Sequence, residues 1–402
     1  MPLPLSGRAV RIGSLGVAVL LLLIFLAWRL DRSRAGRDEV RATLAVGEAL
    51  GGAPDPGFTR AEVPREFRFP VDHGAHDGFR TEWWYVTANL FAADGRAFGA
   101  QLTFFRNALV PPSAIPASPS TFRNAHVWMA HFALGDAASG TFRAFERLTR
   151  EGGELAEVRA SPFRVRVESW SLASVGEPFS PLRLRARESD CAIDLELTAL
   201  RPPLLQGVDG LSRKGDEPGN ASYYYSIPRL SARGTVEIDG REVGVAGEAW
   251  LDREWSTSAL APELAGWDWF ALQLDDGREL MYYRLRRQDG GVDPWSRGRL
   301  TGHDGSSRLL DERSLKIEEL ATWRSPHGAT YPARWRLTVE KDLVLELRPR
   351  LANQELDLSV RYWEGAVAVT GREQGRTLAG HGFVELTGYD GSGSAAVSRK
   401  GD

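Results

Sequence analysis

The sequence predicts an all-β fold, built as barrels or sandwiches, and three observations lead to this prediction. First, apolar and polar residues alternate with a period of two over short segments, most clearly in IDLELTAL (193–200), WRLTVE (335–340), LVLELRP (343–349) and LDLSVRYW (356–363). Second, hairpin-type turns lie between the segments, at ADGR (93–96), IDGRE (238–242), DDGRE (275–279) and GREQGR (371–376). Third, no long amphipathic helical repeat competes with them.

The length of the chain indicates more than one folding unit. It has 402 residues, which exceeds what one hydrophobic core usually serves. At roughly 150 residues per domain we expect about two domains, as two similar halves. The closing stretch over 391–402, GSGSAAVSRKGD, is predicted to be a disordered tail.

The N-terminus carries a targeting signal. The run over 12–28 is free of charge and follows Arg8 and Arg11, as in a signal sequence or a membrane anchor. Because no small-x-small cleavage site follows, the pattern favours an uncleaved single-span transmembrane anchor over 1–30, with cleavage and secretion as the alternative. Residues 31–64 bear Arg, Gly and Pro and are predicted to be a linker with one short helix.

The orientation of this anchor is ambiguous. Arg29, Arg32, Arg34, Arg37 and Arg41 outnumber the basic residues before the span. The positive-inside rule would then keep the bulk of the chain in the cytoplasm. That count conflicts with the export that a family resemblance implies below.

Composition excludes several classes of function. The formal net charge is −3, from 53 acidic against 50 basic residues, so no basic excess indicates a nucleic-acid groove. The single cysteine, Cys191, excludes an intrachain disulfide framework and shares parity with the apolar residues of its strand, which predicts a core position. The sequence has no P-loop and no G-x-G-x-x-G between a strand and a helix, so we expect no cofactor. His73, His76 and Asp77 fall in a Gly-rich loop without a second cluster, which favours loop hydrogen bonding over a metal site.

The stretch EWWYVTANL (82–90) concentrates aromatic surface beside an acid. In a strand, Glu82 and Trp84 lie on one face while Trp83 and Tyr85 lie on the other, so both faces carry a large ring. A strand of a ligand-holding barrel has this property, because one face packs on a neighbour and the other lines a cavity. The alternative is that the rings only fill a core.

Acids recur next to, or two residues from, Trp or Tyr. In AWLDREW, Trp250, Asp252 and Glu254 share a face, which gives Asp252 an aromatic neighbour. Burying a carboxylate is costly, so this setting could hold Asp252 protonated and ready to donate a proton. The alternative is a structural salt bridge between Asp252 and Arg253.

Five ordered motifs carry a family resemblance: FPVDHGAHDGFRTEWWYVTANL, KGDEPGNASYYYSIPRL, VAGEAWLDREW, GWDWFALQLDDGRELMYYRLR and YWEGAV. Together they resemble the AttH-like and carotenoid 1,2-hydratase (CrtC-like) family over nearly the whole chain from Arg65 to Tyr389. The resemblance implies two packed lipocalin-like antiparallel β-barrels, over 65–252 and 253–390, preceded here by one membrane helix. Characterised branches of the family act on long apolar molecules. Bacterial AttH-like members have poorly defined function and are expected to be exported.

Hydratase chemistry, if it applies, needs an acid to protonate an alkene and an aromatic wall to tolerate the resulting carbocation. The resemblance assigns the acid role to Asp252, with Asp268 or Glu82 as alternatives. The rings expected to bind substrate are Trp84, Tyr85, Tyr224, Trp250, Trp267, Tyr283 and Trp363.

Two functions remain. The preferred one is an exported lipocalin-like protein, anchored in the inner membrane with its barrels in the periplasm, that binds an apolar lipid or isoprenoid-like molecule and serves a transport-system partner. The alternative is a cofactor-free hydratase or isomerase of the carotenoid 1,2-hydratase type. The expected partners are thus an apolar ligand and the membrane, without nucleic acid.

Overall fold

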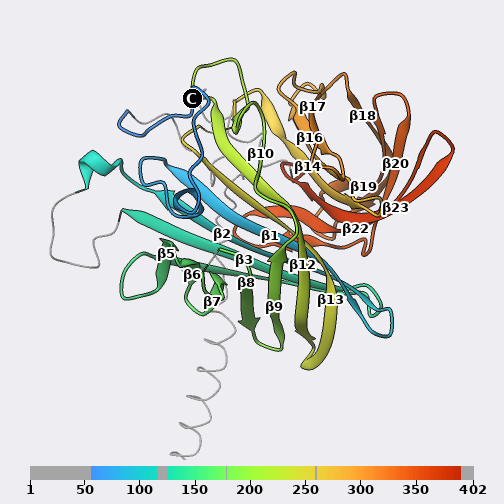
Figure 1. Cartoon of the computed structure of the whole chain (residues 1–402), viewed down its shortest axis with the longest axis horizontal. Coiled ribbons are helices and arrows are strands. Elements are labelled where there is room, and N and C mark those ends of the chain that lie inside the picture. The colour runs from blue at the N-terminus through green and yellow to red at the C-terminus, as the bar shows by residue number, and fades with distance from the viewer. Residues whose placement is uncertain (1–55, 116–124, 178, 259, 391–402) are drawn as a thin grey trace, which may run out of the picture. The chain divides into compact units, whose positions relative to one another are not determined.

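The computed structural model describes residues 56–115, 125–177, 179–258 and 260–390, which form two large antiparallel sheets (Figure 1). The first sheet has the strand order β4-β3-β2-β1-β13-β12-β9-β8-β7-β6-β5, with β10 and β11 paired to β12. Its strands are β1 (Thr81–Ala92), β2 (Ala97–Ala108), β3 (His126–Asp136), β4 (Thr141–Arg150), β5 (Ala156–Ala160), β6 (Phe163–Val167), β7 (Trp170–Ser174), β8 (Leu182–Glu188), β9 (Cys191–Ala199), β10 (Leu204–Leu205), β11 (Leu211–Arg213), β12 (Ala221–Ile238) and β13 (Arg241–Ser256).

The second sheet has the order β17-β16-β15-β14-β23-β22-β20-β19-β18, with β21 paired to β22. Its strands are β14 (Leu264–Leu274), β15 (Glu279–Arg287), β16 (Arg297–Thr301), β17 (Ser307–Asp311), β18 (Leu315–Arg324), β19 (Thr330–Val339), β20 (Leu343–Pro349), β21 (Glu355–Asp357), β22 (Arg361–Glu373) and β23 (Arg376–Leu386). Two short 3-10 helices, η1 (Val71–His73) and η2 (Pro112–Ala114), complete the described elements.

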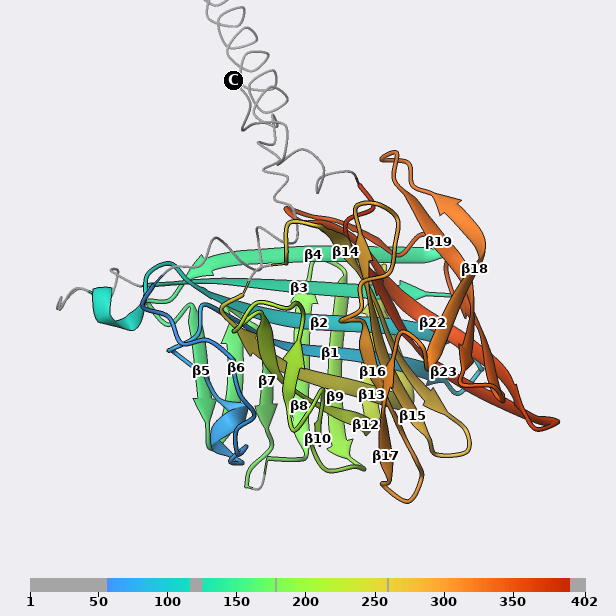
Figure 2. The same ribbon diagram turned by 90° about the horizontal axis from the view of Figure 1, so that it is seen from above.

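Each sheet curls around its own apolar core. In the first sheet, Phe132 of β3 meets Trp170 of β7 edge to face at 5.7 Å, although six strands lie between β3 and β7 in the sheet order. Figure 2 shows the same curl, with β5 to β9 crossing the direction of β1 to β4. In the second sheet, Phe270 of β14 meets Trp335 of β19 at 6.0 Å. Side chains therefore fill the interior of both curls.

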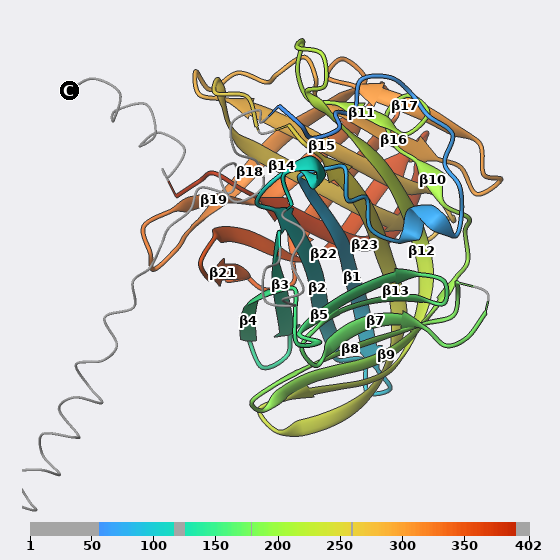
Figure 3. The same ribbon diagram turned by 90° about the vertical axis from the view of Figure 1, so that its left-hand side faces the viewer.

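The two sheets also pack against each other, with β22 and β23 lying along β2 and β1 (Figure 3). The sheets approach each other closely at Gly99, where a Cβ atom would lie 2.6 Å from the Cβ of Ala366. Gln273 bridges the sheets by donating from Nε2 to the carbonyl oxygen of Ala249 over 2.9 Å. Because of this packing, strands such as β1 and β14 bury both faces.

The structure confirms the all-β class, as two curled, lipocalin-like antiparallel sheets. The predicted boundary between 252 and 253 falls inside β13, whereas the second sheet begins at Leu264; a division into separate domains stays a prediction. Within the described ranges no helix has the length and apolarity to span a membrane. The predicted anchor over 1–30, most of the linker and the tail lie outside those ranges.

Candidate functional site

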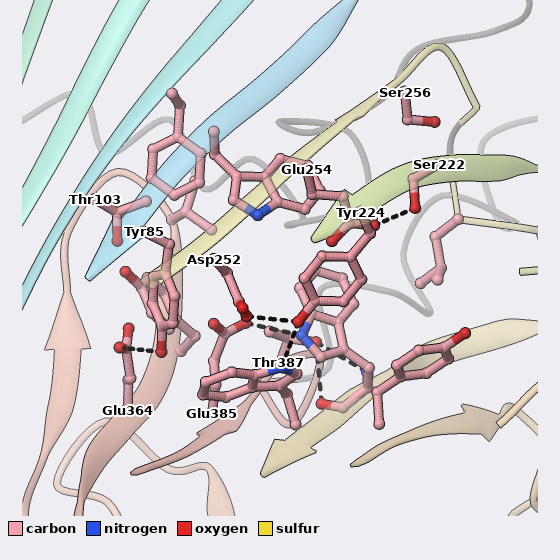
Figure 4. Close-up of a pocket in the computed structure, with 18 of the residues that line it drawn as sticks. Tyr85, Thr103, Ser222, Tyr224, Asp252, Glu254, Ser256, Glu364, Glu385 and Thr387 are labelled. Carbon is pink, nitrogen blue, oxygen red and sulfur yellow. Dashed lines mark hydrogen bonds between the residues drawn. The ribbon is translucent and has the colours of Figure 1, made fainter. Parts of the chain in front are cut away.

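A cavity of about 160 Å³ lies between the two sheets and outside both apolar cores. It is far larger than the space that one water molecule occupies. Its walls combine aromatic rings with carboxyl groups from both sheets (Figure 4). The lining residues used below are Trp83, Tyr85, His131, Lys214, Ser222, Tyr224, Asp252, Glu254, Trp267, Trp269, Tyr283, Tyr362, Glu364 and Glu385.

Strand parity decides which side chains reach this cavity. On β1, Trp83 and Tyr85 line the cavity, whereas Trp84 and Val86 belong to the core of the first sheet. On β13 the residue Asp252 lines it, opposite Tyr85 in the strand register. Successive residues point to opposite faces, so each strand contributes alternate side chains to the site.

Asp252 is buried against the cavity wall, with an exposed fraction of 4%. Its carboxyl group accepts hydrogen bonds from Tyr224 Oη at 2.5 Å, Ser226 Oγ at 2.5 Å and Trp250 Nε1 at 2.7 Å. Burial, with a smaller contribution from the charge of Glu254, raises the pKa of Asp252 to about 7 despite these three donors. Asp252 can therefore hold a proton near neutral pH.

A second pair of acids lies on the wall formed by β22 and β23. Glu364 and Glu385 are direct cross-strand partners. Tyr85 Oη donates to Glu364 Oε1 over 2.6 Å, and Trp267 Nε1 donates to Glu385 Oε1 over 2.8 Å. Burial and the charge of Glu385 raise the pKa of Glu364 well above its ordinary value, and burial raises the pKa of Glu385 to about 7.

The cavity is also lined by the ammonium group of Lys214, which pairs with the carboxyl group of Glu254. Lys214 Nζ lies 3.3 Å from Glu254 Oε1 and 3.9 Å from the ring centroid of Tyr283. Burial alone would lower the pKa of Lys214, but the charge and hydrogen bond of Glu254, together with the nearby Tyr283 and Asp252, outweigh burial and raise it. Ser222 Oγ also donates to Glu254. This corner of the cavity is therefore an ion pair covered by an aromatic ring.

A histidine links the two sheets at the other side of the cavity. His131 Nδ1 lies 2.7 Å from Tyr362 Oη, and its Nε2 lies 3.1 Å from Glu146 Oε2. Tyr362 lines the cavity, while Glu146 is partly exposed on β4. The three side chains form a continuous hydrogen-bonded path from the cavity toward solvent.

Five of the ten site residues predicted from sequence line the cavity: Tyr85, Tyr224, Asp252, Trp267 and Tyr283. Trp250 contacts the site through its hydrogen bond to Asp252. Trp84 and Trp363 instead belong to the two apolar cores, where Trp84 stacks on Trp128 at 5.8 Å and Trp363 packs near Trp335 at 6.1 Å.

The two alternative acids lie away from the cavity, in ion pairs. Glu82 is fully buried on the core side of β1, paired with Arg106 and Arg253. Burial would raise the pKa of Glu82, but these two guanidinium groups hold it well below its ordinary value. Asp268 accepts from Arg284 Nε at 2.8 Å and Arg286 Nε at 2.9 Å. Both acids are therefore paired with arginines outside the cavity.

The predicted histidine loop is part of the first of these clusters. His76 Nε2 lies 3.0 Å from Asp72 Oδ1, and its ring stacks on Trp255 at 3.7 Å. Over the residues with described positions, no group of three or more His, Cys, Asp or Glu side chains is arranged to hold a metal ion.

Comparison with known proteins places the chain in a family. The AttH-like family matches residues 60–389. An AttH protein from Nitrosomonas europaea, known from its crystal structure, is 36% identical, with a TM-score of 0.73 over 83% of this chain and 100% of that one. Kievitone hydratase from Nectria haematococca shares the fold, with a TM-score of 0.62 over 84% of this chain and 98% of its own at 14% identity.

No curated protein matches the sequence significantly. The extent of the family match and the identity to the Nitrosomonas europaea protein show that the chain belongs to the AttH-like family.

Proposed function

We propose that the protein binds an apolar, lipid-like or isoprenoid-like small molecule in the cavity between its two sheets. The observation that carries this proposal is the cavity itself, which lies outside the two apolar cores and is walled by rings such as Tyr85, Trp267 and Trp269. Binding pockets for small molecules are typically concave and mostly apolar, with a few placed polar groups. The pair of lipocalin-like barrels expected from the family resemblance suits this role.

A second candidate function is acid-catalysed hydration or isomerisation of a bound alkene. The specific observation in its favour is Asp252, whose pKa is raised to about 7 by burial beside aromatic rings. The fold is shared with a protein named kievitone hydratase. General acids work best when their pKa lies near the working pH.

The chemistry of this candidate follows from the wall around Asp252. The carboxyl proton passes to one alkene carbon, the π electrons form the new C–H bond, and the other carbon becomes a carbocation. The faces of Tyr224 and Trp269 stabilise that charge by about 0.5–2 kcal/mol per ring. A water molecule then adds to the carbocation and returns a proton to the Asp252 carboxylate, so the acid is regenerated.

Native extraction tests both functions on the purified full-length chain. We expect mass spectrometry to find an apolar molecule bound to wild type and to Asp252→Asn. If the protein is also a hydratase, wild type should convert that molecule to a product heavier by one water, and Asp252→Asn should lower the rate by about 10²–10⁴-fold. Asp194→Asn is the matched control, because Asp194 pairs with Arg183 on the outer face of β9.

The outcomes separate the candidates. Conversion by wild type that is lost in Asp252→Asn supports catalysis. An unchanged ligand on both proteins supports binding alone. Chains that carry no apolar molecule, and that bind none when offered lipid extracts, would contradict the proposed function.

We also propose that residues 1–30 anchor the chain in the inner membrane with the sheets in the periplasm, where a transport system would receive the ligand. The uncharged run over 12–28 supports this proposal. A reporter that is active only in the periplasm, fused to the C-terminus, is expected to be active. Activity of a cytoplasm-only reporter at the same position would reverse the orientation, and release of the chain into the soluble fraction would indicate a cleaved signal peptide.

A further inference from the structure

Glu364 and Glu385 form an unusual pair of buried acids, which carry like charges when both are ionised. They are directly opposite each other on β22 and β23 and face the same cavity. Like charges at directly opposed positions destabilise a sheet, and removing both carboxylates from bulk water adds to the cost. No lysine or arginine of the described ranges forms an ion pair with either acid, and none contributes to the pKa of either one. Structural needs alone do not account for this pair.

One carboxyl oxygen of the pair has no partner. Tyr85 Oη occupies Oε1 of Glu364, but Oε2 is buried without a hydrogen-bond donor among the residues that the structure describes. Glu364 is only 2% exposed and lines the cavity. A buried polar atom that lacks a partner requires an explanation, and a ligand group in the cavity supplies one.

The surroundings of the pair are aromatic. Tyr85 and Trp267 donate to its two carboxyl groups, and Trp269 meets Tyr85 edge to face at 5.2 Å. Figure 4 shows Glu364 and Glu385 on the same wall, with Tyr85 beside Glu364 and Asp252 directed toward Glu385. Aromatic rings next to carboxyl groups are a setting in which proteins hold ammonium groups.

The chain provides an internal example of this chemistry. In the same cavity, the Lys214 ammonium lies between the Glu254 carboxylate and the ring of Tyr283. The pair formed by Glu364 and Glu385 offers carboxyl groups and rings of the same kind, but no side chain of the described chain supplies a cation to it. The difference between the two corners of the cavity is the missing positive charge.

We propose that Glu364 and Glu385, with the rings of Tyr85 and Trp267, form a cation subsite, so that the bound molecule is an apolar compound carrying an alkylammonium group. This inference rests on the proposed function, because it takes the cavity between the sheets as the ligand site. It adds the chemical class of the ligand: a lipid-like amine with its charged end at the β22–β23 wall.

The subsite predicts how binding depends on pH. The other titratable groups that face the pair come from six strands and one loop: Tyr85, His131, Lys214, Tyr224, Asp252, Glu254, Tyr283 and Tyr362. Burial keeps both glutamates protonated in the empty cavity at acidic pH. A permanent cation must displace a proton there, so its affinity is expected to rise with pH by up to tenfold per unit, levelling off above about pH 7.

Two isosteric probes test the inference on the full-length chain. The cation is (6-hydroxyhexyl)trimethylammonium, and the neutral isostere is 7,7-dimethyloctan-1-ol, in which carbon replaces nitrogen. By titration calorimetry at pH 8 we expect the ammonium probe to bind about tenfold more tightly, and this preference to shrink at pH 5. Glu364→Gln and Glu385→Gln should each remove most of the preference. Glu346→Gln, on the outer face of β20, should keep it.

Each result has a separate meaning. Equal or tighter binding of the neutral isostere at pH 8 would overturn the cation subsite and leave the proposed function standing. Binding of neither probe would overturn the cation subsite, and it would overturn the proposed function as well if the chain also binds nothing from lipid extracts. The pH series on wild type alone tests the inference even if a variant fails to fold, because a permanent cation whose affinity is flat from pH 5 to pH 8 displaces no proton.

Discussion

Replacing Glu82 by Gln is expected to lower the free energy of unfolding by about 3–5 kcal/mol, because the change leaves buried arginines without their counter-ion. Glu82 and Arg253 are both 0% exposed, and Arg106 is 1% exposed. Arg253 also lies 3.8 Å above the ring of Trp84, inside the core of the first sheet. Equilibrium urea unfolding, followed by tryptophan fluorescence, measures the loss.

The same ion pairs set the pH dependence of this effect. In the folded chain the pKa of Glu82 lies well below its ordinary value, because Arg253 and Arg106 outweigh the effect of burial. A depressed pKa stabilises the folded state above the unfolded value of about 4.3, and this stability is lost as the pH falls through the folded value. The difference between wild type and Glu82→Gln should therefore narrow in strongly acidic solution.

A double variant and a ligand assay complete the test. Adding Arg253→Met to Glu82→Gln removes one of the two uncompensated charges, so part of the lost stability should return. Since Glu82 points away from the cavity, a folded Glu82→Gln chain should retain its ligand. Wild-type stability in Glu82→Gln would show that the pair contributes nothing. Lost ligand binding in a folded variant would return Glu82 to the list of candidate acids.

The alternation of apolar and polar residues predicted the strands, and five of the ten site residues predicted from the sequence line the cavity. Alternation also placed Asp252 with Trp250 on one face of β13. The resemblance then made Asp252 the first of three candidate acids, and it is the one that lines the cavity. Parity could not tell which face of β1 meets the cavity. The second sheet covers the outer face of β1, so both faces of this strand carry large rings. Only the packing of the two sheets shows that Trp84 belongs to the core and Trp83 to the cavity wall.

The acids missed by sequence reasoning come from pairings distant in the chain. Glu364 lies within the YWEGAV motif, but its partner Glu385 stands in an ordinary alternating stretch, and only the register of β22 and β23 brings them together. Lys214 and Glu254 meet in the same way. The signal that could have found Glu364 is its parity with Tyr362, which puts both on the face opposite Trp363.

Replacing Glu385 by Gln is expected to raise the free energy of unfolding by about 2–3 kcal/mol at pH 8 in the ligand-free chain, and to change little at pH 4. Burial raises the pKa of Glu385 to about 7 in the folded state, against about 4.3 when unfolded. Between these two pKa values, the acid holds its proton in the folded state but has lost it in the unfolded chain. Stability therefore falls as the pH rises from about 4 to about 7. Gln stays neutral throughout and keeps an acceptor for Trp267 Nε1, so it avoids this loss.

A gain in stability of this size from Glu385→Gln is expected because binding sites often retain charges that destabilise the fold. Glu346→Gln is the control of opposite sign, because Arg336 and Arg334 lower the pKa of Glu346 to about 2 and its charge favours the folded state. Thermal unfolding of the three chains between pH 4 and pH 8 measures the comparison. If the ammonium probe then stabilises wild type at pH 8 but not Glu385→Gln, the charge that weakens the empty fold is the charge that holds the ligand. If Glu385→Gln shows no gain at pH 8, the ionised Glu385 does not destabilise the fold, and a cation in the cavity would have no destabilisation to relieve.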